Sequence, residues 1–157
     1  FSRQEKMLDR LIKTAANRSK NQMKTLVQTI LPRIALYKVL QAELPAEETF
    51  THMRTYMMDW VRQKSTLHGE NGVCAGIYRI YSYCFLKIMR TSDLWESTQE
   101  HDKTHFSASI TKCLWHTACQ ENGCPELCPL FCDVDDVTYG GLHKLGFSRT
   151  KNAGLRR

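Results

Sequence analysis

Reactive side chains are concentrated between residues 112 and 141. This stretch holds five of the seven cysteines of the chain, together with three aspartates. Thiols oxidise and neighbouring carboxylates repel one another, so a run that concentrates both is typical of a functional site. Free cysteine is also among the residue types most often buried, so the same run also fits a cysteine-rich core helix beside a solvated acidic turn.

The spacing within this stretch predicts its local structure. Residues 114–122 suit a short helix that Gly123 would cap in the left-handed conformation. Pro125 and Pro129 do not both fit inside one helix, so we expect a turn over residues 124–128 and a helix with Pro129 at its first position. At about 100° per residue, side chains of that helix separate into two faces. The chemical face carries Cys132, Asp135, Asp136 and Tyr139. The apolar face carries Leu130, Val134 and Val137, and Asp133 falls between the two faces.

Three chemistries remain open for the chemical face. In the first, Cys132 or Cys128 is a nucleophile favoured by the helix N-terminus, while an aspartate or His116 moves protons. In the second, the thiols of Cys124, Cys128 and Cys132 bind zinc or another thiophilic metal. His116 or an aspartate would complete that site, although the three-residue gaps lack the two-residue spacing of common zinc knuckles. In the third, the thiols pack under a sheet and the aspartates face water.

Basic residues downstream of this stretch are candidate anion contacts. Arg149 lies on a predicted strand, and its guanidinium offers a two-pronged fork for a substrate carboxylate from a rigid element. His143 and Lys144 fall in a predicted loop and could also meet an anionic substrate.

Helices are predicted for the first part of the chain. Apolar residues recur at helical spacing from about residue 4 to residue 42, and Pro32 is expected to end or kink a helix near Leu31. Leu44-Pro45-Ala46 begins a further helix. Its apolar stripe is Phe50, Met53, Met57, Trp60 and Val61.

Another helix follows a break at residues 68–72. Its apolar face consists of Ile77, Ile80, Tyr81, Cys84, Phe85 and Ile88. We expect this face to be buried, with Cys74 and Cys84 in packing roles.

Strands are predicted after the helices. Phe106, Ala108 and Ile110 alternate with small polar residues, which is the period-two pattern of a strand with one buried face. A second strand is predicted at 145–150, whereas 92–102 is interpreted as a helix end and a connecting turn. The fold class is therefore α+β, with a helical N-terminal half packed on a small antiparallel C-terminal sheet. We expect one domain over residues 1–157, with helices at about 4–100 and a strand, helix and strand around the site at about 105–151.

Composition limits the possible partners. Of the 157 residues, 42% are hydrophobic and 24% charged, and no apolar run is long enough to cross a membrane. The formal charge of +6 comes with Lys and Arg residues that are spread along the first helices and form no single block. No nucleic-acid-binding motif is present, so we expect no nucleic-acid partner. A cationic field instead draws in small anionic substrates such as carboxylates. An odd number of cysteines favours a reducing cytoplasm over a disulfide-bonded scaffold.

Three runs in the last third of the chain are specific enough to suggest a family. They are Thr111-Lys112-Cys113-Leu114-Trp115-His116, Gly123-Cys124-Pro125-Glu126-Leu127-Cys128-Pro129-Leu130-Phe131-Cys132-Asp133-Val134-Asp135-Asp136 and Leu145-Gly146-Phe147-Ser148-Arg149-Thr150-Lys151. Together they resemble the L-2-amino-thiazoline-4-carboxylic acid hydrolase family. The resemblance puts seven residues on motif positions: Cys113, Cys128, Cys132, Asp135, Asp136, Arg149 and Thr150. After Lys151 the sequence departs from the family, which usually continues into a glycine-rich turn and a Cys-Asp-Phe strand.

The resemblance implies hydrolytic opening of a cyclic amidine. Addition at the carbon between ring sulfur and ring nitrogen, followed by departure of the thiolate, would give an N-carbamoyl amino acid. The expected catalytic residues are Cys132, Asp135, Asp136, Cys128, Cys113 and His116. The expected substrate-binding residues are Arg149, Tyr139 and Trp115. No metal or cofactor is required by this reaction, zinc remains an alternative, and a homo-oligomer is compatible with the sequence. A non-enzymatic module that binds a small ligand or a metal through Cys, His and Asp is the alternative function.

Overall fold

The computed structural model describes residues 2–65, 77–140 and 146–150. The helices are α1 (Arg3–Thr14), α2 (Lys20–Thr25), the π-helical η1 (Leu26–Ile30), α3 (Leu31–Gln41), α4 (Ala46–Ser65), α5 (Ile77–Thr91), α6 (Leu114–Glu121), the 3-10 turn η3 (Pro125–Leu127) and α7 (Cys128–Gly140). The strands are β1 (Trp95–His101) and β2 (Phe106–Cys113), which pair antiparallel. This arrangement confirms the predicted α+β class.

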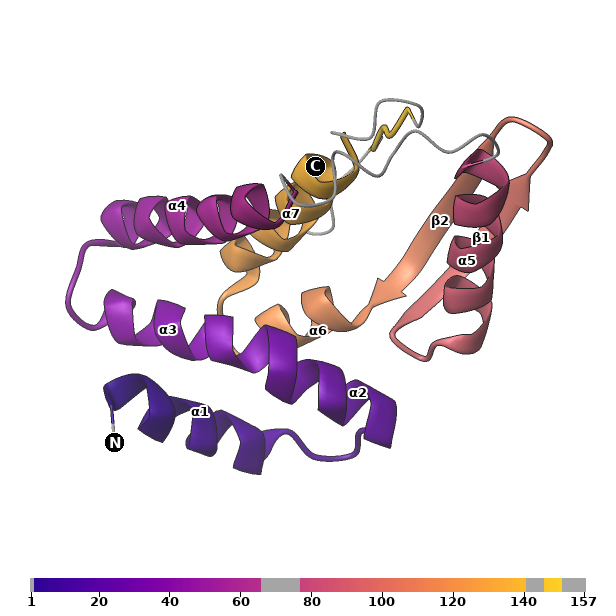
Figure 1. Cartoon of the computed structure of the whole chain (residues 1–157). Coiled ribbons are helices and arrows are strands. Elements are labelled where there is room, and N and C mark those ends of the chain that lie inside the picture. The colour runs from indigo at the N-terminus through magenta and orange to yellow at the C-terminus, as the bar shows by residue number, and fades with distance from the viewer. Residues whose placement is uncertain (1, 66–76, 141–145, 151–157) are drawn as a thin grey trace.

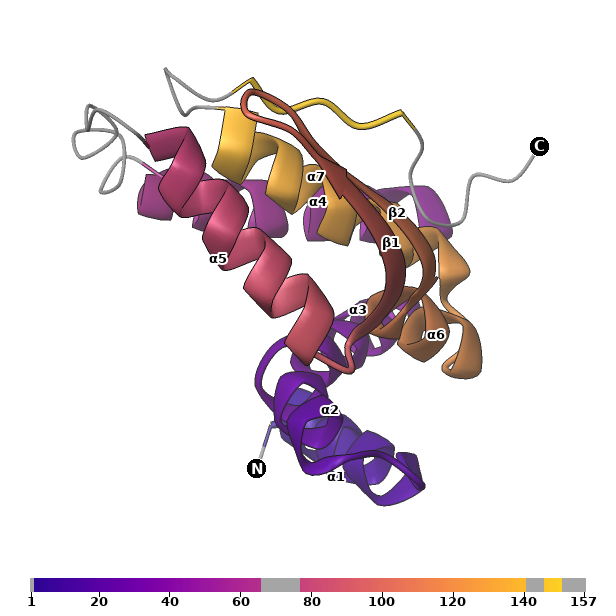
Figure 2. The same cartoon turned by 90° about the vertical axis from the view of Figure 1, so that its right-hand side faces the viewer.

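The described elements form a helical body and an arm (Figure 1). In the body, α1 packs on α3 and α4 packs on α7. The arm consists of α5 and the hairpin, and α5 lies along one face of the two strands (Figure 2). No helix among the described residues is long and apolar enough to cross a membrane.

Side-chain caps define the first helices. Ser2 Oγ accepts the N–H of Glu5 at 3.2 Å, and the Glu5 carboxylate accepts the N–H of Ser2 at 2.6 Å. Ser19 and Gln22 form the same reciprocal box at the start of α2. Each box satisfies N–H groups that have no partner within the helix.

Pro32 was predicted to end or kink a helix near Leu31. It does not end one, but the helical spacing changes at Leu31. The chain runs from α2 through η1 into α3, and Pro32 lies in the first turn of α3. The N–H of Leu31 donates to the carbonyl of Leu26, five residues back, which is the wider spacing of a π-helix. The widened turn makes room for the proline ring, and the Arg33 guanidinium donates to the Thr29 carbonyl at 2.6 Å.

The core lies between the helices of the body. Its fully buried members include Ile30, Leu31, Ile34, Tyr37, Met53, Met57, Leu127 and Leu130. The predicted apolar face of α7 is confirmed, because Leu130 is buried and Val134 and Val137 pack against the core. The predicted stripe on α4 holds at Met53, Met57 and Val61, whereas Trp60 is 40% exposed.

The predicted burial of the α5 face is wrong. Ile80 is 57% exposed, Ile88 is 51% exposed and the Cys84 thiol is exposed. A hairpin of two strands is narrow, so it covers only one side of α5, where the Phe85 ring lies 6.3 Å from that of Phe106 on β2. Helical periodicity shows that a face is apolar but does not show that a partner element covers it. Cys74 lies outside the described residues.

The second strand was predicted in the wrong place. Residues 146–150 contain no strand, and β2 pairs instead with β1, in a segment that was interpreted as a turn. The hairpin turn is closed by the Asp102 carboxylate, which accepts the N–H groups of Thr104 and His105, each at 2.6 Å. These backbone bonds lower the pKa of Asp102 to about 2. Exposure alternates along β1, but the residues on both of its faces are mostly polar, so the hydrophobic pattern gave no strand signal.

Gly123 ends α6 with a φ of +64°, as the sequence predicted. Because an ordinary side chain is strained in this conformation, we expect Gly123→Ala to lower the free energy of unfolding by about 1–2 kcal/mol. Chemical denaturation followed by circular dichroism measures the loss. Gly140→Ala is the matched control, since both glycines have open space where a Cβ would lie. Equal effects of the two substitutions would contradict a role for the left-handed backbone at Gly123.

Candidate functional site

The turn between α6 and α7 positions the cysteine-rich segment. The N–H of Cys124 donates to the carbonyl of Cys119 at 2.9 Å, just past Gly123. The N–H of Leu127 donates to the carbonyl of Cys124 at 3.0 Å and completes the 3-10 turn. The helix α7 starts at Cys128, one residue before the predicted position of Pro129. The predicted turn and helix are therefore confirmed.

The acidic pair of α7 meets Arg149 from the segment 146–150. Nε of Arg149 donates to Oδ1 of Asp136 at 3.2 Å, and Nη2 donates to Oδ2 of Asp135 at 3.2 Å. Nη2 also donates to the carbonyl of Cys132 at 3.5 Å. One guanidinium thus joins three residues of the predicted chemical face. Arg149 was predicted as a clamp for a substrate carboxylate, and in the structure it holds carboxylates of the chain itself.

Asp135 and Arg149 shift each other's pKa. Burial raises the pKa of Asp135, and the Arg149 charge only partly offsets that rise. Burial alone would lower the pKa of Arg149, but its hydrogen bond to Asp136 and the neighbouring acidic groups raise it. Arg149 therefore stays charged, and Asp135 holds its proton more readily than an aspartate in water.

The raised pKa of Asp135 gives a testable titration. We expect its carboxyl carbon to titrate above the range of an aspartate in an unfolded peptide, by a modest amount because 51% of the side chain is exposed. A raised pKa in the folded state means that this group stabilises the fold at low pH and that the contribution is lost as pH rises through the folded pKa. NMR of the carboxyl carbons measures the midpoint, and Asp135→Asn identifies the signal. A midpoint at or below the unfolded value would contradict the effect of burial.

Aromatic rings connect this cluster to the arm. The Tyr139 ring centroid lies 5.4 Å from that of Phe147 and 5.3 Å from that of Phe85 on α5. Phe85 in turn lies 6.3 Å from Phe106 on β2. The Arg149 guanidinium lies over the Phe147 ring at 5.5 Å. Burial raises the pKa of the Tyr139 hydroxyl, which the negative charge of Asp135 supports, so Tyr139 remains a hydrogen-bond donor at neutral pH.

Four thiols form a second group beneath the α7 face. Cys119, Cys124 and Cys128 are buried, and Cys132 is half-buried. Thiols of Cys119 and Cys132 hydrogen-bond to Cys128 and lower its pKa, which the nearby His116 also favours. The same contacts raise the pKa of Cys119, because its thiol acts as the donor toward Cys124 and Cys128. Cys119 also lowers the pKa of Cys124, so Cys124 and Cys128 both hold a negative charge more readily than Cys119 does.

A third group lies where β2 meets α6. Burial raises the pKa of the Cys113 thiol, although the N–H groups of Trp115 and His116 and the indole of Trp95 oppose the rise. The Cys113 side chain makes no capping hydrogen bond at the start of α6. Trp115 stacks on Trp95 with ring centroids 5.3 Å apart and an angle of 12° between the planes. One face of the Trp115 ring is thus covered by Trp95.

The structure brings together most of the predicted site residues. Cys132, Asp135, Asp136, Tyr139 and Arg149 form one contiguous cluster, which we name the α7 cluster. Cys128 interacts with Cys132 of the cluster and with the buried Cys119. His116 and Cys113 interact with Cys128. Phe85 and Phe106 were predicted only as members of a packing face of a helix and a strand, whereas their rings reach the cluster from the arm. Phe147 sits in the same motif as Arg149, and that proximity was a signal that could have been used. His143 and Lys144 lie outside the described residues.

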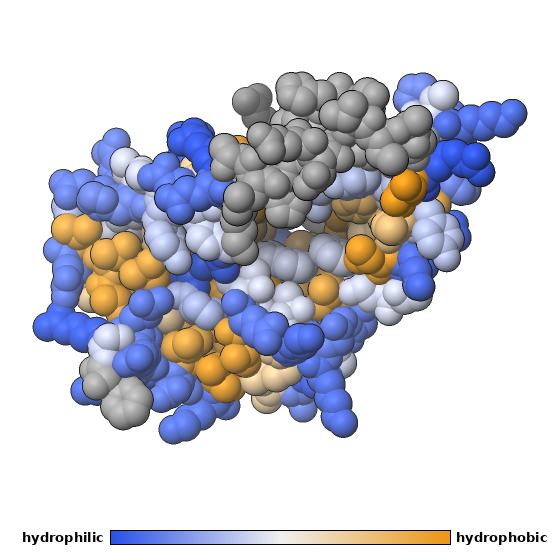
Figure 3. Space-filling view, viewed as in Figure 1, coloured by the Kyte–Doolittle hydropathy of each residue, from blue (hydrophilic) through white to orange (hydrophobic). Residues whose placement is uncertain are grey.

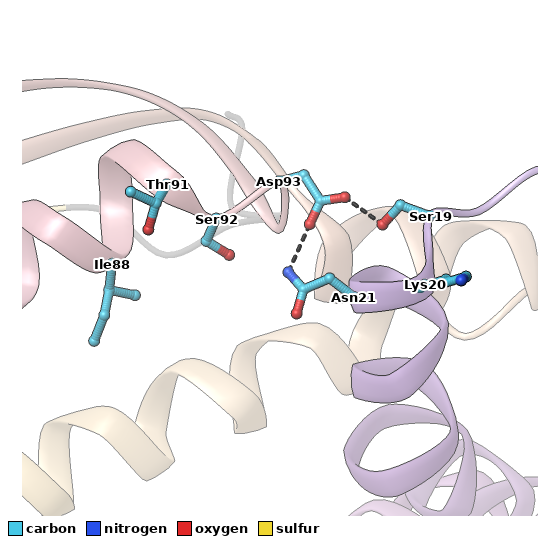
Figure 4. A pocket seen from close by; sticks show the side chains of 7 residues that line it. All are labelled: Ser19, Lys20, Asn21, Ile88, Thr91, Ser92 and Asp93. Carbon is cyan, nitrogen blue, oxygen red and sulfur yellow. Dashed lines mark hydrogen bonds between the residues drawn. The ribbon is translucent and has the colours of Figure 1, made fainter.

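Hollows in the surface lie both near and far from the predicted chemistry. Figure 3 shows the surface hollowed between the body and the arm, with apolar atoms on the side of the arm that faces the body. A separate hollow of about 540 Å³ lies where the arm joins α2 (Figure 4). There the Asp93 carboxylate accepts hydrogen bonds from Ser19 Oγ and, at 2.6 Å, from Asn21 Nδ2. These bonds fasten the arm to the body, and none of the predicted site residues lines that hollow.

Metal-binding geometry is not present in the part of the chain that the structure describes. Among those residues, no three His, Cys, Asp or Glu side chains gather as metal ligands.

Comparison with known proteins identifies a family. The model of the L-2-amino-thiazoline-4-carboxylic acid hydrolase family matches residues 20–155. A search of the curated proteins and of the solved structures finds no match to the chain. The family match runs from α2 through the arm to the α7 cluster and leaves out α1. The chain therefore belongs to the L-2-amino-thiazoline-4-carboxylic acid hydrolase family.

Proposed function

We propose that the protein hydrolyses a small cyclic amidine such as 2-amino-thiazoline-4-carboxylate to an N-carbamoyl amino acid. The observation that carries the proposal is the α7 cluster, in which two carboxylates and a half-buried thiol of one helix meet the guanidinium of Arg149. Family membership supports the hydrolase class. The expected substrate is small and anionic, and the reaction needs no metal or cofactor.

The proposed reaction adds water to the amidine carbon. An aspartate takes a proton from the water as its oxygen bonds to the carbon between ring sulfur and ring nitrogen. That proton passes to the ring nitrogen as the C=N double bond is lost. The C–S bond then breaks, the added hydroxyl becomes the urea carbonyl, and its proton goes to the ring thiolate that leaves. Asp135 and Asp136 are both candidates for this base, because both carboxylates are held by Arg149 beside Cys132.

A covalent route uses the same cluster. The Cys132 thiolate would add to the amidine carbon first, and water would release the product from the thiol in a second step. The buried Cys128 lies in contact with Cys132 and provides a place for the proton of its thiol. The two routes differ in their dependence on Cys132 and share the dependence on the aspartates.

Arg149 has two proposed roles. Its bonds to Asp135 and Asp136 fix the carboxylates on one face. Those bonds use Nε and one terminal nitrogen, and a guanidinium carries five N–H donors, so a substrate carboxylate can be held by the same group. Arg149 then places the substrate ring beside the carboxylate that activates water.

Ring opening of the thiazoline tests the proposal. Purified protein, Cys132→Ser and Asp135→Asn are compared by chromatography of the N-carbamoyl product, and Cys84→Ser serves as a control at an exposed thiol of α5. We expect turnover by the parent protein and by Cys84→Ser, with a large loss in Asp135→Asn. Full activity of Cys132→Ser would exclude the covalent route. Absence of turnover by the folded parent protein would exclude this substrate, and stoichiometric zinc in the same sample would favour a metal-binding module instead.

A further inference from the structure

An apolar surface continues from the α7 cluster onto the arm. The Phe147 ring is 39% exposed and lies 5.4 Å from the Tyr139 ring, which in turn lies 5.3 Å from the ring of Phe85 on α5. Ile88 follows Phe85 by three residues, so the two side chains are neighbours on the helix surface. Ile88 is 51% exposed and lines the hollow where the arm joins α2 (Figure 4). The proposed ring opening of a small thiazoline gives no role to this surface.

The hollow beyond Ile88 has room for part of a ligand. Its volume of about 540 Å³ lies within the range of small-molecule pockets. The acidic group that lines it is already paired within the chain, because the Asp93 carboxylate accepts hydrogen bonds from Ser19 and Asn21. Ile88 therefore offers an apolar contact at the edge of a hollow whose carboxylate is satisfied.

The charges beside this surface favour an anionic ligand over a second copy of the chain. The Arg149 guanidinium lies over the Phe147 ring at 5.5 Å. Helix α5 carries the exposed cations Arg79, Lys87 and Arg90 and no acidic residue. A two-fold contact between copies brings the same helix of each copy together, so it would place these like charges against one another. An anion with an apolar group instead fits both the cations and the apolar surface.

We propose that the substrate of the α7 cluster carries an aliphatic chain on the ring carbon beside the sulfur. The ring and its carboxylate bind at the cluster, and the chain lies along Phe147 and Phe85 towards Ile88. Ile88 is then a specificity-determining residue at the far end of the site. This inference rests on the proposed hydrolysis and narrows its substrate class from a small cyclic amidine to an amphipathic one.

Burial of the chain predicts a preference between substrates. Each methylene that leaves water contributes a factor of about four to binding. The surface contacts the chain from one side, so we expect a hexyl chain to raise kcat/KM by about 10- to 100-fold, which is less than the full product over its carbon atoms. The gain should appear in KM, because the chain is bound equally in the ground state and in the transition state.

The experiment compares 2-amino-thiazoline-4-carboxylate with its 5-hexyl derivative as substrates of the full chain. The ratio of kcat/KM for the hexyl compound to kcat/KM for the unsubstituted compound isolates the contribution of the aliphatic chain. We expect a ratio of about 10 to 100 in the unmodified protein and a fall of about tenfold in Ile88→Asn. Tyr83→Asn is the matched control and should keep the ratio, because Tyr83 is 67% exposed on α5 and lies about 140° around the helix from Ile88.

Three results would overturn the inference. They are a ratio near one in the unmodified protein, a high ratio that Ile88→Asn leaves unchanged, and a dimer in light scattering that Ile88→Asn makes monomeric. The last result would assign Ile88 to a contact between two copies of the chain. Circular dichroism checks that each variant folds, and Ile88→Ala is the replacement if the asparagine variant does not.

Binding distinguishes a failure of this inference from a failure of the proposed hydrolysis. If neither compound is turned over, the hydrolysis fails, and calorimetric titration still gives the dissociation constants of both compounds. Binding of the hexyl compound that is tighter by about 10- to 100-fold, and that Ile88→Asn weakens, would then support the apolar site without the reaction. Equal dissociation constants, or no binding of either compound, would overturn the apolar site as well.

Discussion

Arg149→Met is expected to lower kcat/KM for ring opening by about 10- to 100-fold. Hydrogen bonds to charged groups contribute roughly 1.5–3 kcal/mol each, and every 1.4 kcal/mol of lost transition-state stabilisation is a factor of ten in rate. The substitution keeps the length and the apolar stem of the side chain while it removes the charge between Asp135 and Asp136. Steady-state kinetics with the thiazoline measures the loss.

The pH dependence of this variant distinguishes a role in the site from a role in folding. Without Arg149, the pKa of Asp135 should rise further, because the positive charge that offsets burial is gone. The acidic limb of the rate profile should then move to higher pH. Arg90→Met is the control, since Arg90 is an exposed arginine in the last turn of α5. An unchanged profile and unchanged kcat/KM in Arg149→Met would show that the guanidinium plays no part in the reaction.

Leu130→Ala is expected to lower the free energy of unfolding by about 3–5 kcal/mol. Leu130 is 1% exposed on the apolar face of α7, and a leucine truncated at a fully buried position loses its transfer energy and leaves a cavity. Urea denaturation followed by circular dichroism measures the change. Such a loss is a large fraction of the stability of an ordinary domain, so the variant should also be cleaved faster by proteases.

The matched control for Leu130→Ala is Ile80→Ala. Ile80 is an aliphatic helix residue of similar size, but it is 57% exposed on α5. We expect a change within about 0.5 kcal/mol, as for most surface substitutions. A loss as large as that of Leu130→Ala would show that the outer face of α5 is covered in solution.

The sequence was most informative where local chemistry leaves few choices. Gly123 and the spacing of Pro125 and Pro129 predicted the end of α6, the turn and the start of α7, and all three are confirmed. A rotation of about 100° per residue then placed Cys132 and the acidic pair on one face. That face is the one that contacts Arg149.

Features that depend on tertiary contacts were predicted less well. The strand β1 was missed because its alternating residues are mostly polar, and its pairing with β2 is fixed by a turn around Asp102. The exposure of Ile80 was missed because an apolar helix face carries no information on the width of its partner. The ring contacts of Phe85 and Phe106 with the site depend on the position of the arm, which no local pattern specifies.

The fastening of the arm by Asp93 bears on the order of folding. Arg149 closes on the acidic pair over 13 and 14 residues, whereas the bond between Ser19 and Asp93 joins residues 74 positions apart. Longer closures cost more chain entropy before their contacts form, so contacts of short range tend to precede those of long range. We therefore expect the contacts between Arg149 and the acidic pair to form early in folding. The contact of Phe85 with Tyr139 should form only when the arm docks on α2.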